Sequence, residues 1–146
     1  MANIREPLPQ PIQEHMFSPF SIQQIDQLRG LLDEREELLH EDIVRATNSI
    51  EDYQQLAGEV PDTGDQATAD LTIDLNHAEV SRDVAELREI TAARDRMKEG
   101  EYGLCTQCGD VIPFERLRIQ PTATRCQPCQ AVWEKTYARE TSGTSL

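Results

Sequence analysis

The sequence has few aromatic residues and a strong excess of negative charge. Only 5% of its 146 residues are Phe, Trp or Tyr, and 38% are hydrophobic. This composition suits elongated helices, which bury little surface per residue, better than a sandwich or a barrel. Lys and Arg number 14 against 27 Asp and Glu, so the formal net charge is −13. Because affinity for nucleic acid depends on basic side chains that neutralise phosphates, we expect no direct binding to DNA.

Targeting and membrane segments are also missing from the sequence. Residues 1–20 contain four prolines and no apolar core of seven residues, so they do not resemble a secretory signal peptide. No apolar run approaches the ~20 residues that a membrane-spanning helix requires. We therefore expect a cytoplasmic protein that contacts no membrane. In that reducing compartment its four cysteines favour metal binding or redox chemistry over disulfides. Residues 1–20 are interpreted as a loosely packed N-terminal arm.

A long amphipathic helix is predicted to begin after Ser21, whose hydroxyl can accept a backbone N–H of the first turn. A seven-residue repeat then places apolar or aromatic residues at nine of eleven seam positions, as a coiled-coil partner requires. The seam positions are Ile22, Ile25, Arg29, Leu32, Glu36, Leu39, Ile43, Ala46, Ile50, Tyr53 and Ala57. Residues 21–60 contain ten acidic residues against three Arg, and the faces outside the seam are interpreted as solvated surface.

The segment from Val60 to Ala67 is predicted to be the turn of a helical hairpin, because Pro61 and Gly64 flank or separate two aspartates there. A second helix should begin near Asp65 and stop before Gly100. Its seam is less regular than that of the first helix. The expected seam residues are Ile73, His77, Val80, Val84 and Leu87, with a slip before Ile90 and Met97. Two helices of about 35 residues would each rise about 50 Å.

The four cysteines form the most specific motif in the chain. Cys105 and Cys108 are followed after seventeen residues by Cys126 and Cys129, a spacing that predicts one structural zinc ion held by four thiolates. Such a site has no open position for water, which argues against metal-assisted hydrolysis. Iron is the nearest alternative ion, because four thiolates also suit iron. Redox activity of a Cys-x-x-Cys pair is disfavoured, since the βαβ context of thioredoxin-type motifs is absent.

Together these patterns predict a mainly α fold with a long antiparallel hairpin, a small four-cysteine module and a short C-terminal helix. The apolar residues between Val111 and Ile119 are expected to form a short hairpin or strand pair over the metal. Trp133 and Tyr137 should lie on the C-terminal helix and pack against the module or the helix bases. The expected domains are an arm (1–20), the hairpin (21–100, turn at 60–67), the zinc module with its helix (101–140) and a flexible tail (141–146).

The combination of hairpin, aspartate turn and cysteine module resembles the DksA/TraR family of bacterial RNA polymerase regulators. The matching stretches are Pro61-Asp62-Thr63-Gly64-Asp65-Gln66-Ala67 for the family's turn motif, Tyr102-Gly103-Leu104-Cys105 through Cys129 for the zinc finger, and Arg118-Ile119-Gln120-Pro121-Thr122-Ala123 within it. The resemblance covers roughly residues 21–140. The turn and the finger together are far more specific than either alone.

The resemblance implies a monomeric regulator that is not an enzyme. In the family, the hairpin enters the secondary channel of RNA polymerase, its turn approaches the catalytic magnesium, and the zinc module stays at the rim. The factor then changes promoter-complex stability and initiation without touching DNA. By the same match, Asp62, Asp65 and Ala67 would contact the polymerase active-site region. Arg82 and Arg116 would be available for rim contacts.

The sequence departs from the family at the positions implied to bind guanosine tetraphosphate. Three positions that are basic in the best-known members hold Glu89, Gln120 and Gln130. Because a multiply charged anion binds poorly beside a glutamate, we expect weak or absent synergy with this alarmone.

Several alternatives remain open at this point. The two turn aspartates can act as helix caps, which contribute about 1 kcal/mol, and capping is compatible with a polymerase contact. Two carboxylates three residues apart could also hold a magnesium ion and promote RNA cleavage, as in the Gre factors. A rubredoxin-like iron electron carrier and an acidic adaptor for another protein are the remaining readings.

Overall fold

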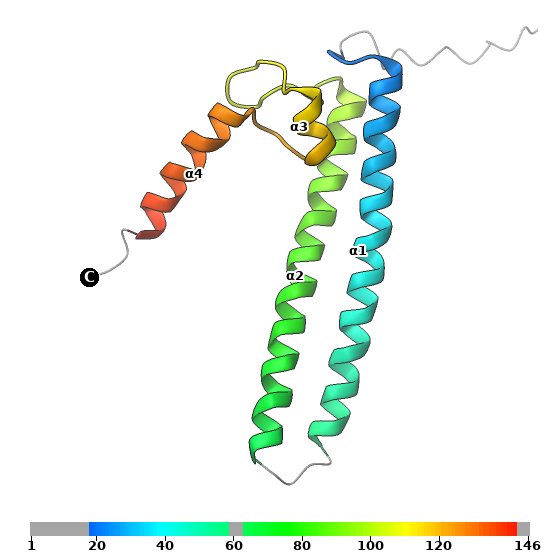
Figure 1. Cartoon of the computed structure of the whole chain (residues 1–146), viewed down its shortest axis with the longest axis vertical. Coiled ribbons are helices and arrows are strands. Elements are labelled where there is room, and N and C mark those ends of the chain that lie inside the picture. Colours follow the sequence, from blue (N-terminus) through cyan, green and yellow to red (C-terminus); the bar gives the residue numbers. More distant parts are fainter. Residues whose placement is uncertain (1–17, 59–62, 143–146) are drawn as a thin grey trace, which may run out of the picture. The chain divides into compact units, whose positions relative to one another are not determined.

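The computed structural model describes residues 18–58 and 63–142, and within them the side chains of 57, 63 and 138–142 are not described. These residues form helices α1 (Ile22–Ala57), α2 (Thr63–Glu99), α3 (Phe114–Ile119) and α4 (Gln127–Ser142) (Figure 1). The predicted mainly α fold, with a helical hairpin, a four-cysteine module and a C-terminal helix, is confirmed. None of the helices within these ranges is both long and apolar enough to cross a membrane.

The expected strand pair over the metal is not formed. In the described part of the chain the only β pairing is one antiparallel bridge between Leu104 and Val111. Pro113 then precedes α3, and its carbonyl accepts the N–H groups of Arg116 and Leu117 at 3.0 and 3.2 Å. A proline fixes φ near the helical value and lacks an N–H, so it starts a helix more readily than it continues a strand.

The chain divides into two compact units, one formed by residues 29–92 and the other by residues up to 28 and from 93 onward. The first turns of α1 and the last turns of α2 therefore belong to the same unit as the cysteine module. The predicted domains divide the chain by function instead, with a boundary at residue 100. That division stays a prediction.

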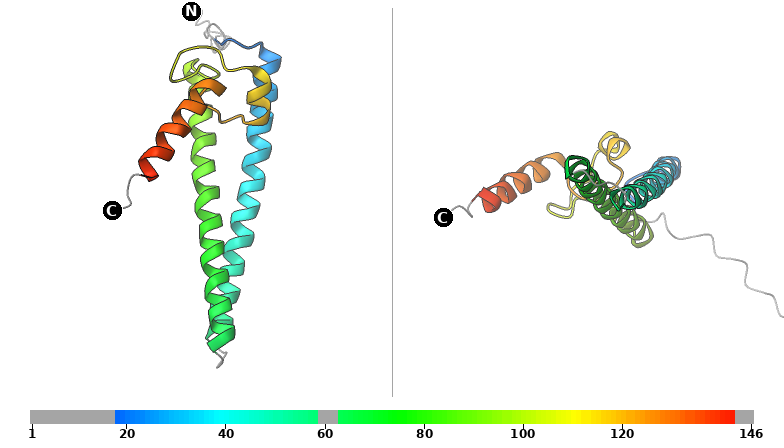
Figure 2. Two further views of the ribbon diagram at one scale, coloured as in Figure 1. Left: turned by 60° about the vertical axis from the view of Figure 1, so that its left-hand side comes forward. Right: turned by 90° about the horizontal axis from the view of Figure 1, so that it is seen from below.

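In the unit 29–92, α1 and α2 run side by side in opposite directions (Figures 1 and 2). Its buried apolar residues are Leu32, Leu39, Ala46, Ile50, Ala69 and Ile90. The predicted seam on α1 accounts for the first four of these. On α2, Ile73, Val80, Val84 and Leu87 are half-buried, and His77 is exposed rather than in the seam. The α2 side of the coiled coil is thus the weaker one.

Two polar contacts link the helices of this unit. Arg35 donates from Nε and Nη2 to both carboxylate oxygens of Glu86, at 2.6 and 2.8 Å. The hydrogen bond from Arg35 lowers the pKa of Glu86. Asn76 Nδ2 donates to Ser49 Oγ at 3.1 Å. Because exposed ion pairs contribute only about 0.2–1 kcal/mol, these contacts matter more for the axial register of the two helices than for stability.

The other unit begins with the first two turns of α1. Ser21 caps α1 through a capping box, in which Gln24 N–H donates to Ser21 Oγ at 3.2 Å and Ser21 N–H donates to Gln24 Oε1 at 3.0 Å. The N-cap predicted from the sequence is confirmed. Leu28, not Arg29, is buried here together with Ile25, so the seam leaves the regular repeat at this point. Ile22, expected in the seam, is 58% exposed.

At its other end, α2 closes with the hydrogen bonds of a Schellman motif. Glu101 N–H donates to Arg96 O at 2.9 Å, and Gly100 N–H donates to Met97 O at 3.4 Å. This turn directs the chain into the cysteine module. Its core consists of Tyr102, Ile112, Leu117 and Ala123, in the same unit as the buried Ala93 and Met97 of α2.

Candidate metal centre

The first cysteine pair lies in a tight turn that follows α2. Cys105 N–H donates to Asp110 O at 2.8 Å, and Gly109 N–H donates to Cys105 O at 2.8 Å. Gly109 has φ of +77°, a left-handed conformation that favours glycine. The chain therefore folds back immediately after Cys108, and both sulfurs of the Cys-x-x-Cys turn lie on the same side.

The second pair lies at the start of α4. Cys126 directly precedes the helix, Cys129 lies in its first turn, and Gln130 N–H donates to Cys126 O at 2.9 Å. The two pairs are tied together by Thr106, whose N–H and hydroxyl both donate to Thr124 O, at 2.9 and 3.1 Å. Backbone hydrogen bonds thus fix the separation of the pairs independently of the sulfurs.

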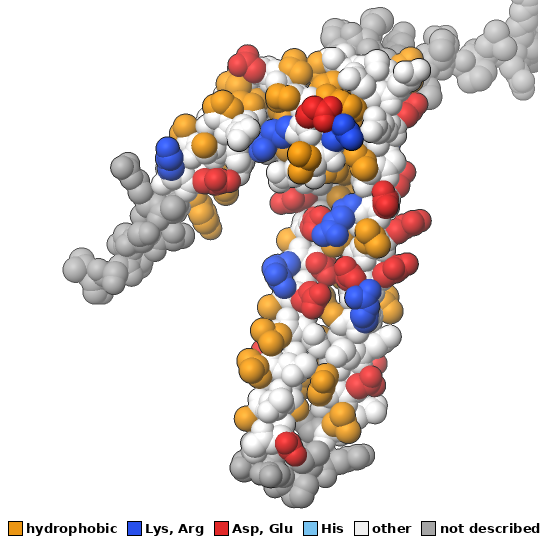
Figure 3. All heavy atoms as spheres, in the orientation of Figure 1, with side chains coloured by type: hydrophobic (Ala, Val, Ile, Leu, Met, Phe, Trp, Pro, Cys, Tyr) orange, Lys and Arg blue, Asp and Glu red, His pale blue; other side chains and the backbone are white. Residues whose placement is uncertain are grey.

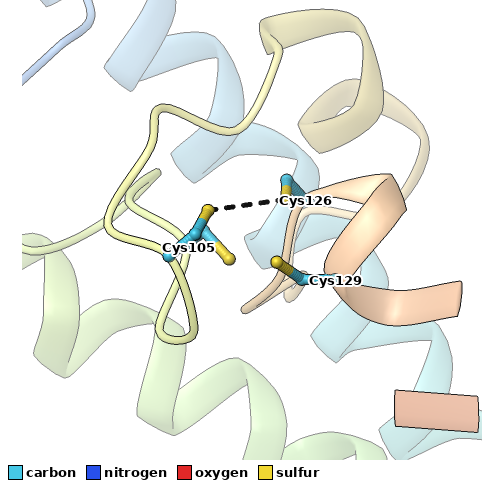
Figure 4. Close-up of side chains that lie close together, drawn as sticks. Cys105, Cys126 and Cys129 are labelled. Atoms are coloured by element: carbon cyan, nitrogen blue, oxygen red, sulfur yellow. Dashed lines mark hydrogen bonds between the residues drawn. The ribbon is translucent and has the colours of Figure 1, made fainter. Parts of the chain in front are cut away.

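All four cysteine sulfurs lie within 4.8 Å of one another. Figure 4 shows the side chains of Cys105, Cys126 and Cys129 gathered in the space between the first turn and the start of α4. The Sγ atoms of Cys108 and Cys126 are 3.8 Å apart. A zinc ion with four Zn–S bonds of about 2.3 Å requires sulfur–sulfur separations of about 3.8 Å in a regular tetrahedron. The four sulfurs are therefore close enough together to share one tetrahedral ion of the size of zinc.

The environment of the sulfurs favours a bound cation. Burial alone would raise the pKa of the Cys105 thiol, but backbone N–H groups of Cys108, Cys126 and Gln107 point at its sulfur and lower that pKa to about 6. Hydrogen bonding with Cys126 is the main cause that raises the pKa of Cys129, to about 12. The Cys105 thiolate thus forms readily, while the thiol of Cys129 resists ionisation. A divalent cation at the centre would stabilise all four thiolates together.

Tyr102 and Phe20 pack within and against the cysteine module. Tyr102 is 2% exposed, and its hydroxyl donates to Pro121 O at 2.7 Å. Burial raises the pKa of this phenol. The Phe20 ring lies against Gly103 and 6.1 Å from the ring of Phe114, centroid to centroid. A residue just before α1 therefore holds the start of the metal-binding segment in place.

The remaining predicted site residues lie outside this cluster. Asp62 is outside the described residues. Asp65 is exposed in the first turn of α2, where a carboxylate interacts favourably with the helix dipole, and Ala67 is exposed half a turn further on. Arg82 is also exposed. Arg116 is half-buried, and its Nε donates to Arg125 O at 3.1 Å, so it has a structural contact within the module.

The positions predicted to weaken alarmone binding are spread over three helices or their ends. Glu89 on α2 and Gln120 after α3 are exposed. Gln130 on α4 is half-buried, and its Nε2 donates to Glu134 Oε1 at 2.9 Å. None of the three brings a positive charge to the surface.

Sequence reasoning missed one contact near the cysteines. The Arg125 guanidinium lies 4.8 Å from the centroid of the Trp133 ring, which in turn stacks on Tyr137. The four-residue spacing of the two aromatics was visible in the sequence. The position of Arg125 was not, because it depends on how the loop before Cys126 meets α4.

The four-sulfur cluster and the helices define a small zinc-finger protein that also contains a helical hairpin. Residues 100–135 match the sequence profile of the prokaryotic dksA/traR C4-type zinc finger. In a comparison of structures, transcription factor DksA2 from Pseudomonas aeruginosa matches with a TM-score of 0.70 and 26% sequence identity, over 88% of this chain and 94% of that one. The chain is a DksA-like zinc-finger protein, and its residues 100–135 match the dksA/traR finger.

Curated relatives agree with this assignment. The RNA polymerase-binding transcription factor DksA of Haemophilus influenzae is 29% identical over 96 residues, which are 65% of this chain and 66% of that protein. General stress protein 16O of Bacillus subtilis is 29% identical over 109 residues, 73% of this chain and 61% of that protein. The chain thus spans about two thirds or less of the length of these relatives.

Proposed function

We propose that this chain is a cytoplasmic, monomeric regulator of transcription that binds bacterial RNA polymerase and is not itself an enzyme. The observation that carries the proposal is the combination of a dksA/traR zinc finger with an antiparallel hairpin that exposes Asp65 and Ala67 at the start of α2. Two relatives in sequence are named RNA polymerase-binding transcription factors and support it. The net charge of −13 supports a protein partner rather than DNA.

In this proposal Cys105, Cys108, Cys126 and Cys129 hold one structural zinc ion. When bound, zinc would supply a fixed tetrahedral centre, with no open position for water or substrate. The metal module would contact the rim of the polymerase secondary channel, with Arg82 and Arg116 as candidate contacts. The hairpin would enter the channel with Asp62, Asp65 and Ala67 foremost.

We expect Asp62→Asn/Asp65→Asn to abolish most of the effect on transcription from a ribosomal RNA promoter while leaving the protein folded. Losing a hydrogen bond to a charged group removes about 1.5–3 kcal/mol, a factor of about ten or more in effect. The measurement is an in vitro transcription titration, with binding to core polymerase measured in parallel. Asp70→Asn/Asp74→Asn is a matched control, since both aspartates are exposed on the same helix. Equal activity of wild type and the Asp62/Asp65 variant would contradict this mechanism.

The unit 29–92 also carries large apolar side chains that the coiled coil does not bury. Leu71 and Leu75 are 60% and 61% exposed, one turn apart on α2, and Leu56 on α1 is 53% exposed. On the face shown in Figure 3, charged side chains crowd the middle of the hairpin, and hydrophobic ones stand out nearer the α1–α2 connection. A hairpin that enters a protein channel could bury these side chains against its partner. They contribute little to the packing between α1 and α2.

Leu71→Gln/Leu75→Gln is therefore expected to weaken binding to core polymerase without affecting the fold. Burying a leucine contributes about 1.5–3 kcal/mol, so affinity should fall by about tenfold or more. Stability should change by no more than about 0.5 kcal/mol, because both side chains are exposed. Fluorescence anisotropy with labelled protein measures the first and thermal unfolding the second. Leu38→Gln, 47% exposed on α1 and farther from the connection, is the control. Unchanged affinity of the double variant would exclude this face from the contact.

We further propose that guanosine tetraphosphate has little effect on this regulator. Glu89, Gln120 and Gln130 offer no positive charge to the anion, and Gln130 is engaged with Glu134. Titration of the alarmone into the transcription assay should change the response by less than about fivefold, since most exposed charge contacts contribute under 1 kcal/mol. Strong enhancement by the alarmone would refute this part of the proposal and leave polymerase binding intact.

Two alternative functions have direct tests. A Gre-like factor would shorten the transcript in stalled elongation complexes, and we expect no cleavage. A four-thiolate iron protein would be coloured and redox-active. Metal analysis of the purified protein should instead give zinc.

A further inference from the structure

The start of helix α4 supplies two of the four candidate metal ligands. Cys126 directly precedes the helix and Cys129 lies in its first turn, so the direction of that turn decides where the two sulfurs lie. Every residue from Ala131 to Tyr137, in contrast, is exposed. A 16-residue helix is only marginally stable in water without tertiary contacts. A contact that fixes the start of α4 would therefore also fix two ligands.

Arg125 makes a contact of this kind. It is the residue before Cys126, and its guanidinium carbon lies 4.8 Å from the centroid of the Trp133 ring, inside the ~6 Å range of a cation–π interaction. Trp133 is four residues after Cys129, which places it one helical turn further along the same side of α4. The contact thus joins the residue before one ligand to a residue one turn beyond the other. Both ligands lie within the segment that it closes.

Further interactions hold both ends of this contact. On the loop side, Arg125 O accepts a hydrogen bond from Arg116 Nε at 3.1 Å, and Arg116 belongs to α3 of the same unit. On the helix side, Trp133 stacks on Tyr137 with centroids 5.2 Å apart and planes at 13°. The guanidinium therefore lies between a backbone that is held in place and a ring whose rotation is restricted.

The burial of Arg125 indicates a specific role for this side chain. The residue is half-buried, and its Nε is buried without a hydrogen-bond partner among the described residues. Removing part of a cation from water is unfavourable unless another interaction compensates for it. A cation–π contact can do so, because it is stronger where the cation is desolvated, and a planar guanidinium stacks well on an aromatic ring. The contact with Trp133 therefore explains why an arginine is buried here.

We propose that Arg125 is a positioning residue for the zinc site. By lying over Trp133, it holds the first turn of α4 in the orientation in which Cys126 and Cys129 face the first cysteine pair. It does not touch the ion. Its effect appears in how tightly zinc is held, since the set of four ligands is complete without it. This role does not depend on binding to RNA polymerase.

Competition with a chromogenic chelator measures the zinc affinity of the full chain. Arg125→Ala should weaken zinc binding by about tenfold, a usual effect when a residue that orients a metal ligand is lost. Arg125→Lys keeps a cation that can lie over the ring, and its affinity should stay within about threefold of the wild type. Arg118→Ala is the matched control, because it removes the same charge from an exposed position in the same unit. It should bind zinc as the wild type does.

Two further measurements distinguish positioning of the ligands from a general loss of structure. Trp133→Leu removes the same contact from the helix side, and it should lower zinc affinity as much as Arg125→Ala does. The double variant should lose no more affinity than either single variant, because both remove one shared interaction. At saturating zinc, hydrogen exchange of the Ile112 amide, which donates to Gly103 O, should match the wild type in all variants.

Wild-type zinc affinity in Arg125→Ala would overturn the proposal. So would equal weakening by Arg118→Ala, no recovery of affinity in Arg125→Lys, or additive losses in the double variant. Loss of Ile112 protection at saturating zinc would overturn it as well, because Arg125 would then support the fold of the whole module. If Arg125→Ala binds no zinc at all, Trp133→Leu decides alone: a loss of about tenfold supports the proposal, and wild-type affinity contradicts it.

Discussion

Cys126→Ser is expected to unfold the module of residues 100–135 while the coiled coil of residues 29–92 stays helical. The module buries only a handful of side chains, chiefly Tyr102, Ile112 and Leu117. A core of that size does not offset the chain entropy of a small module by itself. Structural zinc contributes about 10–16 kcal/mol in zinc-finger peptides at neutral pH. Loss of one thiolate should therefore release the ion and the fold together.

The measurements are zinc content and amide hydrogen exchange. Protection should disappear at the amides of Cys105 and Ile112, which donate to Asp110 O and Gly103 O, and remain in the middle of α1 and α2. Gln107→Ser is the matched control, since this exposed residue lies between Cys105 and Cys108 and its side chain is not a ligand. Full zinc content with unchanged protection in Cys126→Ser would show that the fourth sulfur is dispensable.

Gly103→Ala is expected to destabilise the unit that contains the zinc module by about 2–5 kcal/mol, the sum of backbone strain and steric overlap. Gly103 has φ of +83°, and an added Cβ would lie 2.1 Å from Cε2 of Phe20. The ring is itself held against Phe114. The methyl group would therefore displace Phe20 and break the contact that ties the start of α1 to the cysteine module.

Alanine substitutions at two other glycines distinguish the cost of backbone strain from the cost of steric overlap. In Gly109→Ala the added Cβ would have no atom within 4 Å, but the residue would keep a φ of +77°. Backbone strain alone should therefore lower the stability of this variant, by about 1–2 kcal/mol. Gly30→Ala lies inside α1 with open space around it, and should stabilise α1 by about 0.5–1 kcal/mol. Adding Phe20→Ala to Gly103→Ala should remove the overlap term, so the double variant loses less than the two single losses combined. Thermal unfolding of zinc-loaded protein measures all five variants, Phe20→Ala included, and additive losses would contradict the steric account.

The proposed function gives a physical reason for the irregular apolar packing between α1 and α2. A sequence optimised only for a coiled coil would place Leu71 and Leu75 in the seam, yet both are exposed, while the polar Asn76 contacts Ser49 of α1. Proteins commonly depart from local rules at functional sites. The polar face and the exposed leucines are both consistent with a hairpin shaped by a partner.

Local chemistry was enough to predict several features of this protein. The cysteine spacing identified a four-thiolate module, because two tight Cys-x-x-Cys turns are the local condition for bringing four sulfurs together. Ser21 and Gly100 identified the ends of long helices, because capping depends on residues within one turn. The expectation that the protein does not bind DNA needs only the summed charge of the chain, and it stays a prediction.

Tertiary contacts decided the rest. Leu28 replaces Arg29 in the core because α1 packs there on the module unit and no longer follows a single repeat. Residues 114–119 form α3 rather than a strand because Pro113 starts a helix and the metal turns leave no partner strand within the described residues. The contacts of Phe20 with Gly103, and of Arg125 with Trp133, join residues 83 and 8 positions apart. Such pairings depend on the arrangement of whole segments in space, which no local pattern of residues encodes.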